Sequence, residues 1–151
     1  MLKNIDPLLN AEILHALRAM GHGDTVVICD TNFPADSVAQ QTVLGSLLRI
    51  DGVNAARAVQ AVLSLMPLDT FVDDSARRME IVGNPSEVPA VQQEVQAEID
   101  RAEGKPWPMT SIERMAFYEH AKQAYCVIAT GERRFYGCFL FKKGVIAPEA
   151  V

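Results

Sequence analysis

Apolar residues recur at the three- and four-residue spacing of an amphipathic helix in two segments of the chain. Each segment follows an asparagine, a residue that commonly caps the first turn of a helix. We predict one helix that begins after Asn10 and ends at Gly21, since the residue after a helix often needs a positive φ. We predict a second that begins after Asn54 and ends before Pro67. Their apolar stripes consist of Ile13, Leu14, Leu17 and Met20, and of Ala55, Val59, Val62, Leu63 and Met66.

Two further helices are predicted in the second half of the chain. A long polar one begins at Ser86 and ends before Gly104, with Val91, Val95 and Ile99 on one side. This narrow stripe is typical of a helix that lies on the surface of a protein. The other begins after Ser111, which can cap it, and continues through Ala124.

Four short apolar runs predict strands. Residues 25–29 form a continuous apolar run rich in β-branched residues, typical of a strand covered on both faces. Residues 79–82 predict a short strand before a turn. Residues 125–130 and 136–141 are joined by a link short enough for a hairpin, so we expect them to pair antiparallel. The segments 31–37 and 106–108 are expected to be loops, although the latter could form an edge segment.

Helices that alternate with buried strands predict one α/β domain over residues 1–151. The expected architecture is a three-layer α/β/α domain with a mostly parallel sheet and a C-terminal antiparallel hairpin. The length suits a single core, and 49% apolar with 22% charged residues is typical of a globular protein.

Composition narrows the classes of function. The net charge of −5 argues against a nucleic-acid or anionic-membrane surface. No apolar stretch approaches the roughly 20 residues of a membrane helix, and Asp6, Pro7 and Glu12 interrupt any signal-peptide core. We therefore expect a cytoplasmic protein whose three cysteines are reduced thiols, with Cys29 and Cys126 in the core. No zinc-ligand spacing or phosphate-binding loop occurs, so no metal or cofactor is predicted.

Two short segments hold candidate functional residues. His22 lies between two glycines, where it could act in proton transfer or simply stabilise the end of a helix. Asp30 follows the run 25–29, and ligands of open α/β sheets bind at the carboxyl ends of strands. Arg114, Tyr118 and Lys122 are spaced to line one face of a helix, either as a solvated face or against an uncharged hydroxyl-rich ligand. The other two histidines, His15 and His120, are expected on the surface.

Several motifs occur in the same order along almost the whole chain: MGHGD, CDTNFPADS, IERMAFYEHAKQA, TGERRFYGC and KKGV. With these motifs the chain resembles the L-fucose mutarotase and D-ribose pyranase family. MGHGD, AFYE and YG resemble the fucose branch. The ribose branch typically has threonine in place of Gly23, histidine in place of Tyr118, and alanine and asparagine in place of Gly137 and Cys138.

The resemblance implies an enzyme that interconverts the anomers of a monosaccharide, L-fucose above all, without a cofactor. The family's catalytic histidine falls on His22, with Tyr118 or Tyr136 as its partner in general acid–base catalysis. Substrate contacts fall on Asp30, Arg114, Tyr118, Tyr136 and Gly137. The family usually has asparagine where this chain has Cys138, which suggests a specificity position. The resemblance also implies a homo-oligomer, commonly a decameric ring, with sites where subunits meet.

The spacing of His22 and Asp30 constrains such a site. If residues 24–30 form one extended strand, these two residues lie at opposite ends, up to roughly 26–29 Å apart. Either the His22 loop folds back, or the site combines residues of two chains, which is the more economical interpretation.

Three other functions are compatible with the same residues. The first is a pyranase that acts on ribose or another monosaccharide. The second is a non-catalytic sugar-binding protein that serves transport. The third is a metal-dependent enzyme that uses His22, Asp24 and Asp30, although no second histidine occurs at ligand spacing.

Overall fold

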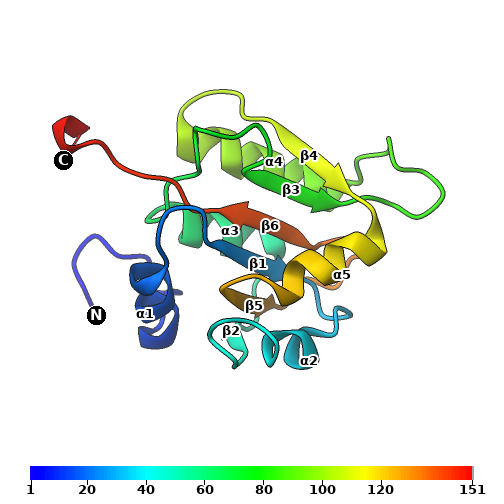
Figure 1. Cartoon of the computed structure of the whole chain (residues 1–151), viewed down its shortest axis with the longest axis horizontal. Coiled ribbons are helices and arrows are strands. Elements are labelled where there is room, and N and C mark those ends of the chain that lie inside the picture. Colours follow the sequence, from blue (N-terminus) through cyan, green and yellow to red (C-terminus); the bar gives the residue numbers. More distant parts are fainter. Residues whose placement is uncertain (151) are drawn as a thin grey trace.

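A six-stranded sheet lies between two layers of helices in the computed structural model, which describes residues 1–150 (Figure 1). The strand order is β2-β5-β1-β6-β3-β4. Five strands run in one direction, and β6 runs antiparallel to both of its neighbours. The strands are β1 (Thr25–Cys29), β2 (Leu48–Ile50), β3 (Ala76–Met79), β4 (Met109–Ile112), β5 (Cys126–Thr130) and β6 (Phe139–Lys142).

Alternate side chains of the central strands enter two separate cores. In β1, Val26 and Ile28 pack toward one helical layer, and Val27 and Cys29 pack toward the other. All four are fully buried, which explains why the run is apolar throughout. The first layer consists of α1 (Ala11–Ala19), α3 (Ala55–Leu63) and α4 (Ala90–Glu103), and the second consists of α2 (Ala35–Ala39) and α5 (Arg114–Lys122). The predicted three-layer α/β/α architecture is confirmed.

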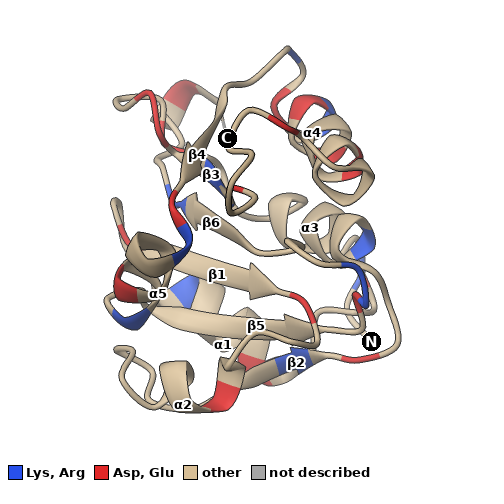
Figure 2. Ribbon diagram, turned by 90° about the vertical axis from the view of Figure 1, so that its right-hand side faces the viewer, with Lys and Arg blue, Asp and Glu red and all other residues tan. Residues whose placement is uncertain are grey.

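Figure 2 shows α5 at the left of the sheet and α4 at its upper right, and the two helices pack on different cores. The central strands β1 and β5 contain no charged residue, and the charged residues lie mainly on helices and loops. A short 3₁₀ helix, η1 (Pro148–Ala150), follows the last strand. Within residues 1–150, no helix is long and apolar enough to cross a membrane.

Both predicted asparagine caps are confirmed. The Asn10 Oδ1 accepts a 3.0 Å hydrogen bond from the N–H of Ile13 and so caps the start of α1. The Asn54 Oδ1 accepts a 2.9 Å hydrogen bond from the N–H of Arg57 and so caps the start of α3. These contacts satisfy backbone donors that have no partner within the helix.

The predicted end of α1 at Gly21 is wrong by one residue. Met20 is the C-cap with an extended backbone, and the positive φ of 87° belongs to Gly23. The Nζ of Lys143 donates to the carbonyls of Leu17 (2.7 Å) and Met20. A distant lysine therefore takes over the carbonyls that a glycine cap would have satisfied.

The predicted starts of the two later helices are also wrong. The helix α4 begins at Ala90, after Pro89, and not at Ser86. The helix α5 begins at Arg114, because the Glu113 carboxylate accepts the N–H groups of Met115 and Ala116 and so acts as its N-cap. Ser111 belongs to β4 instead.

Four further elements differ from the sequence-based expectation. The strand β3 covers residues 76–79 and not 79–82. The segment 31–37 is a loop only in its first half, since α2 begins at Ala35. The short edge strands β2 and β4 were not predicted at all.

The expected hairpin between the last two strands is wrong. β1 lies between them: Val27 pairs with Val127 of β5 on one side and with Leu140 of β6 on the other. The link over 131–138 therefore crosses the end of β1. This crossing brings the residues before β6 to the carboxyl end of β1, where Asp30 follows the strand.

Candidate active site

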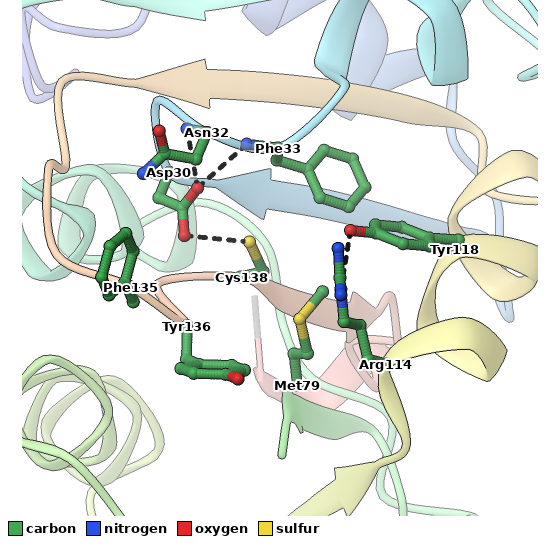
Figure 3. A pocket seen from close by; sticks show the side chains of 9 residues that line it. All are labelled: Asp30, Asn32, Phe33, Met79, Arg114, Tyr118, Phe135, Tyr136 and Cys138. Atoms are coloured by element: carbon green, nitrogen blue, oxygen red, sulfur yellow. Dashed lines mark hydrogen bonds between the residues drawn. The ribbon is translucent and has the colours of Figure 1, made fainter. Parts of the chain in front are cut away.

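A pocket of about 220 Å³ opens at the carboxyl end of β1 (Figure 3). This is smaller than the roughly 300–1,000 Å³ of pockets that take drug-sized ligands, so it suits a small molecule. The loop after β1, the end of β3, the helix α5 and the segment before β6 all contribute to it. Its lining consists of Asp30, Asn32, Phe33, Met79, Arg114, Tyr118, Phe135, Tyr136 and Cys138.

Asp30 is held by four donors of its own chain. Its Oδ1 accepts the N–H groups of Asn32 (2.9 Å) and Phe33 (3.0 Å). Its Oδ2 accepts the N–H of Gly137 (3.1 Å) and the thiol of Cys138 (3.4 Å). The residue is only 5% exposed, so this network fixes both the carboxylate and the segment before β6 against each other.

Arg114 and Tyr118 form a pair on one face of α5. The Arg114 Nε donates a 3.1 Å hydrogen bond to the Tyr118 hydroxyl oxygen, and its guanidinium lies over the ring at 5.5 Å. The hydrogen bond from Nε to the phenol raises the pKa of Arg114. The phenol accepts this bond and keeps its own proton available to a ligand. Figure 3 shows both side chains directed toward the cavity.

Tyr136 has a left-handed backbone, with φ at 63°, and its ring lines the pocket. Its hydroxyl accepts the N–H of Val82 at 3.2 Å. The next residue has to be glycine, because a Cβ at Gly137 would lie 2.8 Å from the Glu132 side chain and 3.3 Å from the Asp30 Cβ. Glycine thus permits the backbone approach that joins Tyr136 to Asp30.

Glu132 anchors the link over 131–138, which crosses the end of β1 and carries Tyr136. Burial by itself would raise the pKa of this carboxyl, but hydrogen bonds from Arg134 and from the N–H of Ala55 bring it down to about 2. Arg134 also binds Glu94 of α4 through two 2.8 Å contacts. The segment that carries Tyr136 is therefore tied to both α3 and α4.

Cys138 is buried beside Asp30. Desolvation, and then the negative charge of Asp30, raise the pKa of this thiol. A protonated thiol is a weak nucleophile. The site supports its interpretation as a residue that shapes the pocket and not as one that forms a covalent bond with substrate.

His22 does not line this pocket. It lies before β1, at the opposite end of the strand, with its Nε2 3.1 Å from the Asp69 Oδ2 and its ring edge-on to Phe71 at 5.5 Å. The His22 side chain is 45% exposed, whereas Asp69 is 4% exposed. The N–H of Phe71, and then His22, lower the pKa of Asp69. A buried carboxylate that holds a half-exposed imidazole can orient it for proton transfer.

The structure thus brings together six of the seven predicted site residues and leaves His22 apart. Asp30 is also at the opposite end of β1 from His22 and Asp24, the other two residues considered as metal ligands. The Asp24 carboxylate accepts a 2.7 Å hydrogen bond from the N–H of Gly21. Among residues 1–150, no three histidine, cysteine or acidic residues are grouped to hold a metal ion. His15 and His120 are exposed, as predicted, and Lys122 pairs with Glu119 at 2.8 Å.

Several residues of the pocket and of the surroundings of His22 were not identified from the sequence. Asn32, Phe33, Met79 and Phe135 line the pocket. Asp69 lies 47 positions after its histidine partner, and nothing in the local pattern marks it. The one available signal was the sequence after Asp30, since an aspartate followed by a polar residue commonly forms a turn with the backbone two residues on.

A model of the RbsD / FucU transport protein family matches residues 3–146. The chain belongs to the RbsD / FucU family. This confirms the resemblance that the sequence motifs indicated. The fucose mutarotase of Homo sapiens is 42% identical over 149 residues, which cover 97% of this chain and 95% of that one.

Solved structures of RbsD / FucU relatives agree with the fold described above. Protein Atu2016, described as a suspected sugar-binding protein, is 68% identical with a TM-score of 0.95 over 97% of each chain. The fucose mutarotase of Streptococcus pneumoniae, crystallised in complex with L-fucose, is 36% identical with a TM-score of 0.86. That match covers 97% of this chain and all of the other.

Proposed function

We propose that this protein is a mutarotase, an isomerase that interconverts the α and β anomers of a monosaccharide, with L-fucose as its substrate. The observation that carries the proposal is the pocket at the end of β1. It gathers a buried carboxylate, a guanidinium and two phenols around a small cavity. The chain is also similar, over its whole length, to a fucose mutarotase that binds L-fucose.

Mutarotation requires two proton transfers and no redox step. A base removes the proton of the anomeric hydroxyl while an acid protonates the ring oxygen, and the bond between C1 and the ring oxygen breaks. The open-chain aldehyde then rotates about its C1–C2 bond. Closure on the other face returns both protons, so the enzyme ends unchanged. General acid–base groups contribute roughly 10²–10⁴-fold to such steps.

The pocket residues divide into binding and proton-transfer groups under this proposal. Asp30, Arg114 and Tyr136, with the backbone at Gly137 and Cys138, hold the sugar hydroxyls and fix the orientation of the ring. Tyr118 is the proton-transfer group inside the pocket. The positive charge of Arg114, 3.1 Å from the phenol oxygen, would stabilise negative charge that develops there during transfer.

His22 acts as the second proton-transfer group in this proposal, and it reaches the sugar from a neighbouring subunit. Within one chain it lies at the far end of a strand from the pocket, and extended backbone spans roughly 3.3 Å per residue. Its imidazole is half-exposed and already oriented by the buried Asp69. A neighbour whose pocket faces this end would complete the site.

Such a contact joins two different surfaces of the chain, and contacts of this kind generate rings when the rotation between subunits closes. We accordingly propose a homo-oligomer, with a decameric ring as its form. Large apolar side chains are exposed at both surfaces: Phe71 beside His22 is 72% exposed, and Phe135 at the pocket is 75% exposed. Their burial between subunits would favour assembly.

We place the enzyme in the cytoplasm. Its three cysteines, Cys29, Cys126 and Cys138, are all buried free thiols. Free thiols are typical of a reducing compartment.

The test is proton NMR of anomer exchange at equilibrium, with and without protein, for fucose, ribose, galactose and glucose. We expect the protein to accelerate the exchange of fucose most. A preference for ribose would instead indicate a pyranase. A protein that binds sugar and leaves every exchange rate at its spontaneous value would be a transport accessory, and the proposal would fail.

A further inference from the structure

Tyr136 occupies a backbone conformation that it cannot hold alone. Within residues 1–150, it and Asn4 are the two non-glycine residues with positive φ. Bulky side chains adopt this region rarely, because the Cβ crowds the following carbonyl oxygen. The conformation also turns the phenol ring into the pocket. Something in the surroundings therefore has to hold it.

The buried amide of Gln92 contacts this backbone directly. Gln92 lies in the first turn of α4 and is 0% exposed. Its Nε2 donates to the carbonyl of Tyr136 at 3.0 Å and to the carbonyl of Met79 at 2.7 Å. Met79 also lines the pocket, and its N–H donates to the carbonyl of Cys138 at 3.1 Å. One amide group thus joins two walls of the pocket from behind.

The orientation of that amide is fixed by Arg78. The Gln92 Oε1 accepts a 3.0 Å hydrogen bond from the Arg78 Nη1, and a guanidinium can only donate. The amide nitrogen must then face the two carbonyls. Arg78 is itself 7% exposed and donates to the carbonyls of Glu87 and Pro85. Gln92 and Arg78 are thus both buried, and their side-chain nitrogen and oxygen atoms named here all have hydrogen-bond partners.

We infer that Gln92 is a positioning residue that holds Tyr136 in its left-handed conformation and thereby sets the place of the phenol in the pocket. Gln92 does not line the cavity, and we assign its effect on the sugar to Tyr136, while its bond to the Met79 carbonyl anchors the amide. The inference rests on the proposed function for its effect on activity, but its effect on structure does not depend on that function.

The test compares Gln92→Met, which keeps length and removes the hydrogen bonds, with Gln93→Met as the matched control. Gln93 is the adjacent exposed glutamine, and its Nε2 donates to the Val88 carbonyl of its own helix start at 2.7 Å. We expect Gln92→Met to weaken sugar affinity and exchange by about tenfold. Gln93→Met should match the unmodified protein. Equal behaviour of the two variants would overturn the inference.

A double-mutant cycle separates positioning from general destabilisation. In a Tyr136→Ala background, Gln92→Met should cause no further loss of activity, although it should still lower thermal stability. Additive losses of activity would contradict a role through Tyr136. If Gln92→Met does not fold, Gln92→Asn retains the amide on a shorter side chain, and we expect the same non-additivity with a smaller loss.

A crystal structure of the folded Gln92 variant gives the result that does not depend on catalysis. We expect Tyr136 to leave the left-handed region, with its ring displaced from the pocket. An unchanged φ at Tyr136 would overturn the inference. If the unmodified protein does not accelerate anomer exchange, the proposed function fails, and this structural result still decides the role of Gln92.

Discussion

The two ends of β1 carry the two halves of the proposed site, and they are built in opposite ways. At the carboxyl end, Asp30 is 5% exposed and accepts four hydrogen bonds from its own chain. At the amino end, the His22 side chain is 45% exposed and its Nε2 contacts the buried carboxylate of Asp69. The carboxyl end forms a pocket whose carboxylate is held by internal hydrogen bonds, and the amino end exposes an imidazole to solvent.

This difference indicates which end of β1 binds the sugar and which end supplies a proton-transfer group. A pocket held by main-chain donors keeps its binding groups in place without a ligand, which favours orientation of a sugar ring. An exposed imidazole held on one side by a buried carboxylate is free on its other side to enter a neighbouring surface. The comparison therefore predicts that changes at the amino end chiefly reduce proton transfer, whereas changes at the carboxyl end, apart from Tyr118, chiefly reduce binding.

The largest effect is expected from His22→Gln. Glutamine keeps size and polarity but cannot shuttle a proton near neutral pH, so anomer exchange should fall by about two orders of magnitude or more. Sugar affinity, folding and assembly should be retained. NMR exchange rates and calorimetric titration with fucose measure the two properties. His15→Gln, an exposed histidine on α1, serves as the control, and a near-normal exchange rate in His22→Gln would show that His22 is only structural.

Asp69→Asn should reduce exchange next, by about tenfold. The neutral amide orients the imidazole less strongly and does not stabilise its protonated form. Affinity for fucose should remain, because Asp69 lies away from the pocket. The exposed Asp73 offers the control, Asp73→Asn. A loss of affinity without a loss of exchange rate would place Asp69 in binding instead.

Asp30→Asn should weaken fucose binding by about tenfold and lower the free energy of unfolding by about 1–3 kcal/mol. Either orientation of the amide sets an NH₂ group against N–H or S–H donors that had a carboxylate oxygen as their acceptor. Titration calorimetry and thermal unfolding measure the two losses, with Asp36→Asn on α2 as an exposed control. Unchanged affinity would contradict the assignment of Asp30 to the binding half.

The smallest effect is expected at Cys138. The 3.4 Å contact between its thiol and Asp30 is a weak hydrogen bond, so Cys138→Ala should keep activity within about threefold. Cys138→Asn should keep or improve activity on fucose, because its amide can donate to Asp30 and to a sugar hydroxyl. Complete loss of exchange in Cys138→Ala would refute a specificity role.

Elements with strong local signals were predicted well from the sequence. The helices α1 and α3 have asparagine caps and regular apolar stripes, and β1 and β5 are continuous apolar runs. The strand β3 was predicted three residues too late, because Arg77 and Arg78 interrupt its apolar pattern. Arg78 can be buried because Gln92, 14 positions later, and the carbonyls of Pro85 and Glu87 accept its hydrogen bonds. The pairing of β6 with β1 was not visible either, since chain proximity alone favours a hairpin with β5.

The candidate site divides in the same way. Asp30 was identified by its place after a buried strand, and Arg114 and Tyr118 by their helical spacing. Tyr136 and Cys138 were identified through family motifs. The fold brings all five to one pocket. The partners that hold them were not identified. Asp69 and Gln92 act through contacts between distant segments, and such contacts depend on the order of strands in the sheet and not on local spacing.

The composite site is tested most directly by mixing two inactive chains. His22→Gln lacks the proton-transfer group of one surface, and Tyr118→Phe lacks that of the other. If each site takes His22 from one subunit and Tyr118 from its neighbour, co-assembly at equal amounts restores about a quarter of the sites in a ring. We predict that the co-refolded mixture regains anomer exchange to that level, measured by NMR on fucose. A mixture no more active than the two variants measured separately would contradict the composite site.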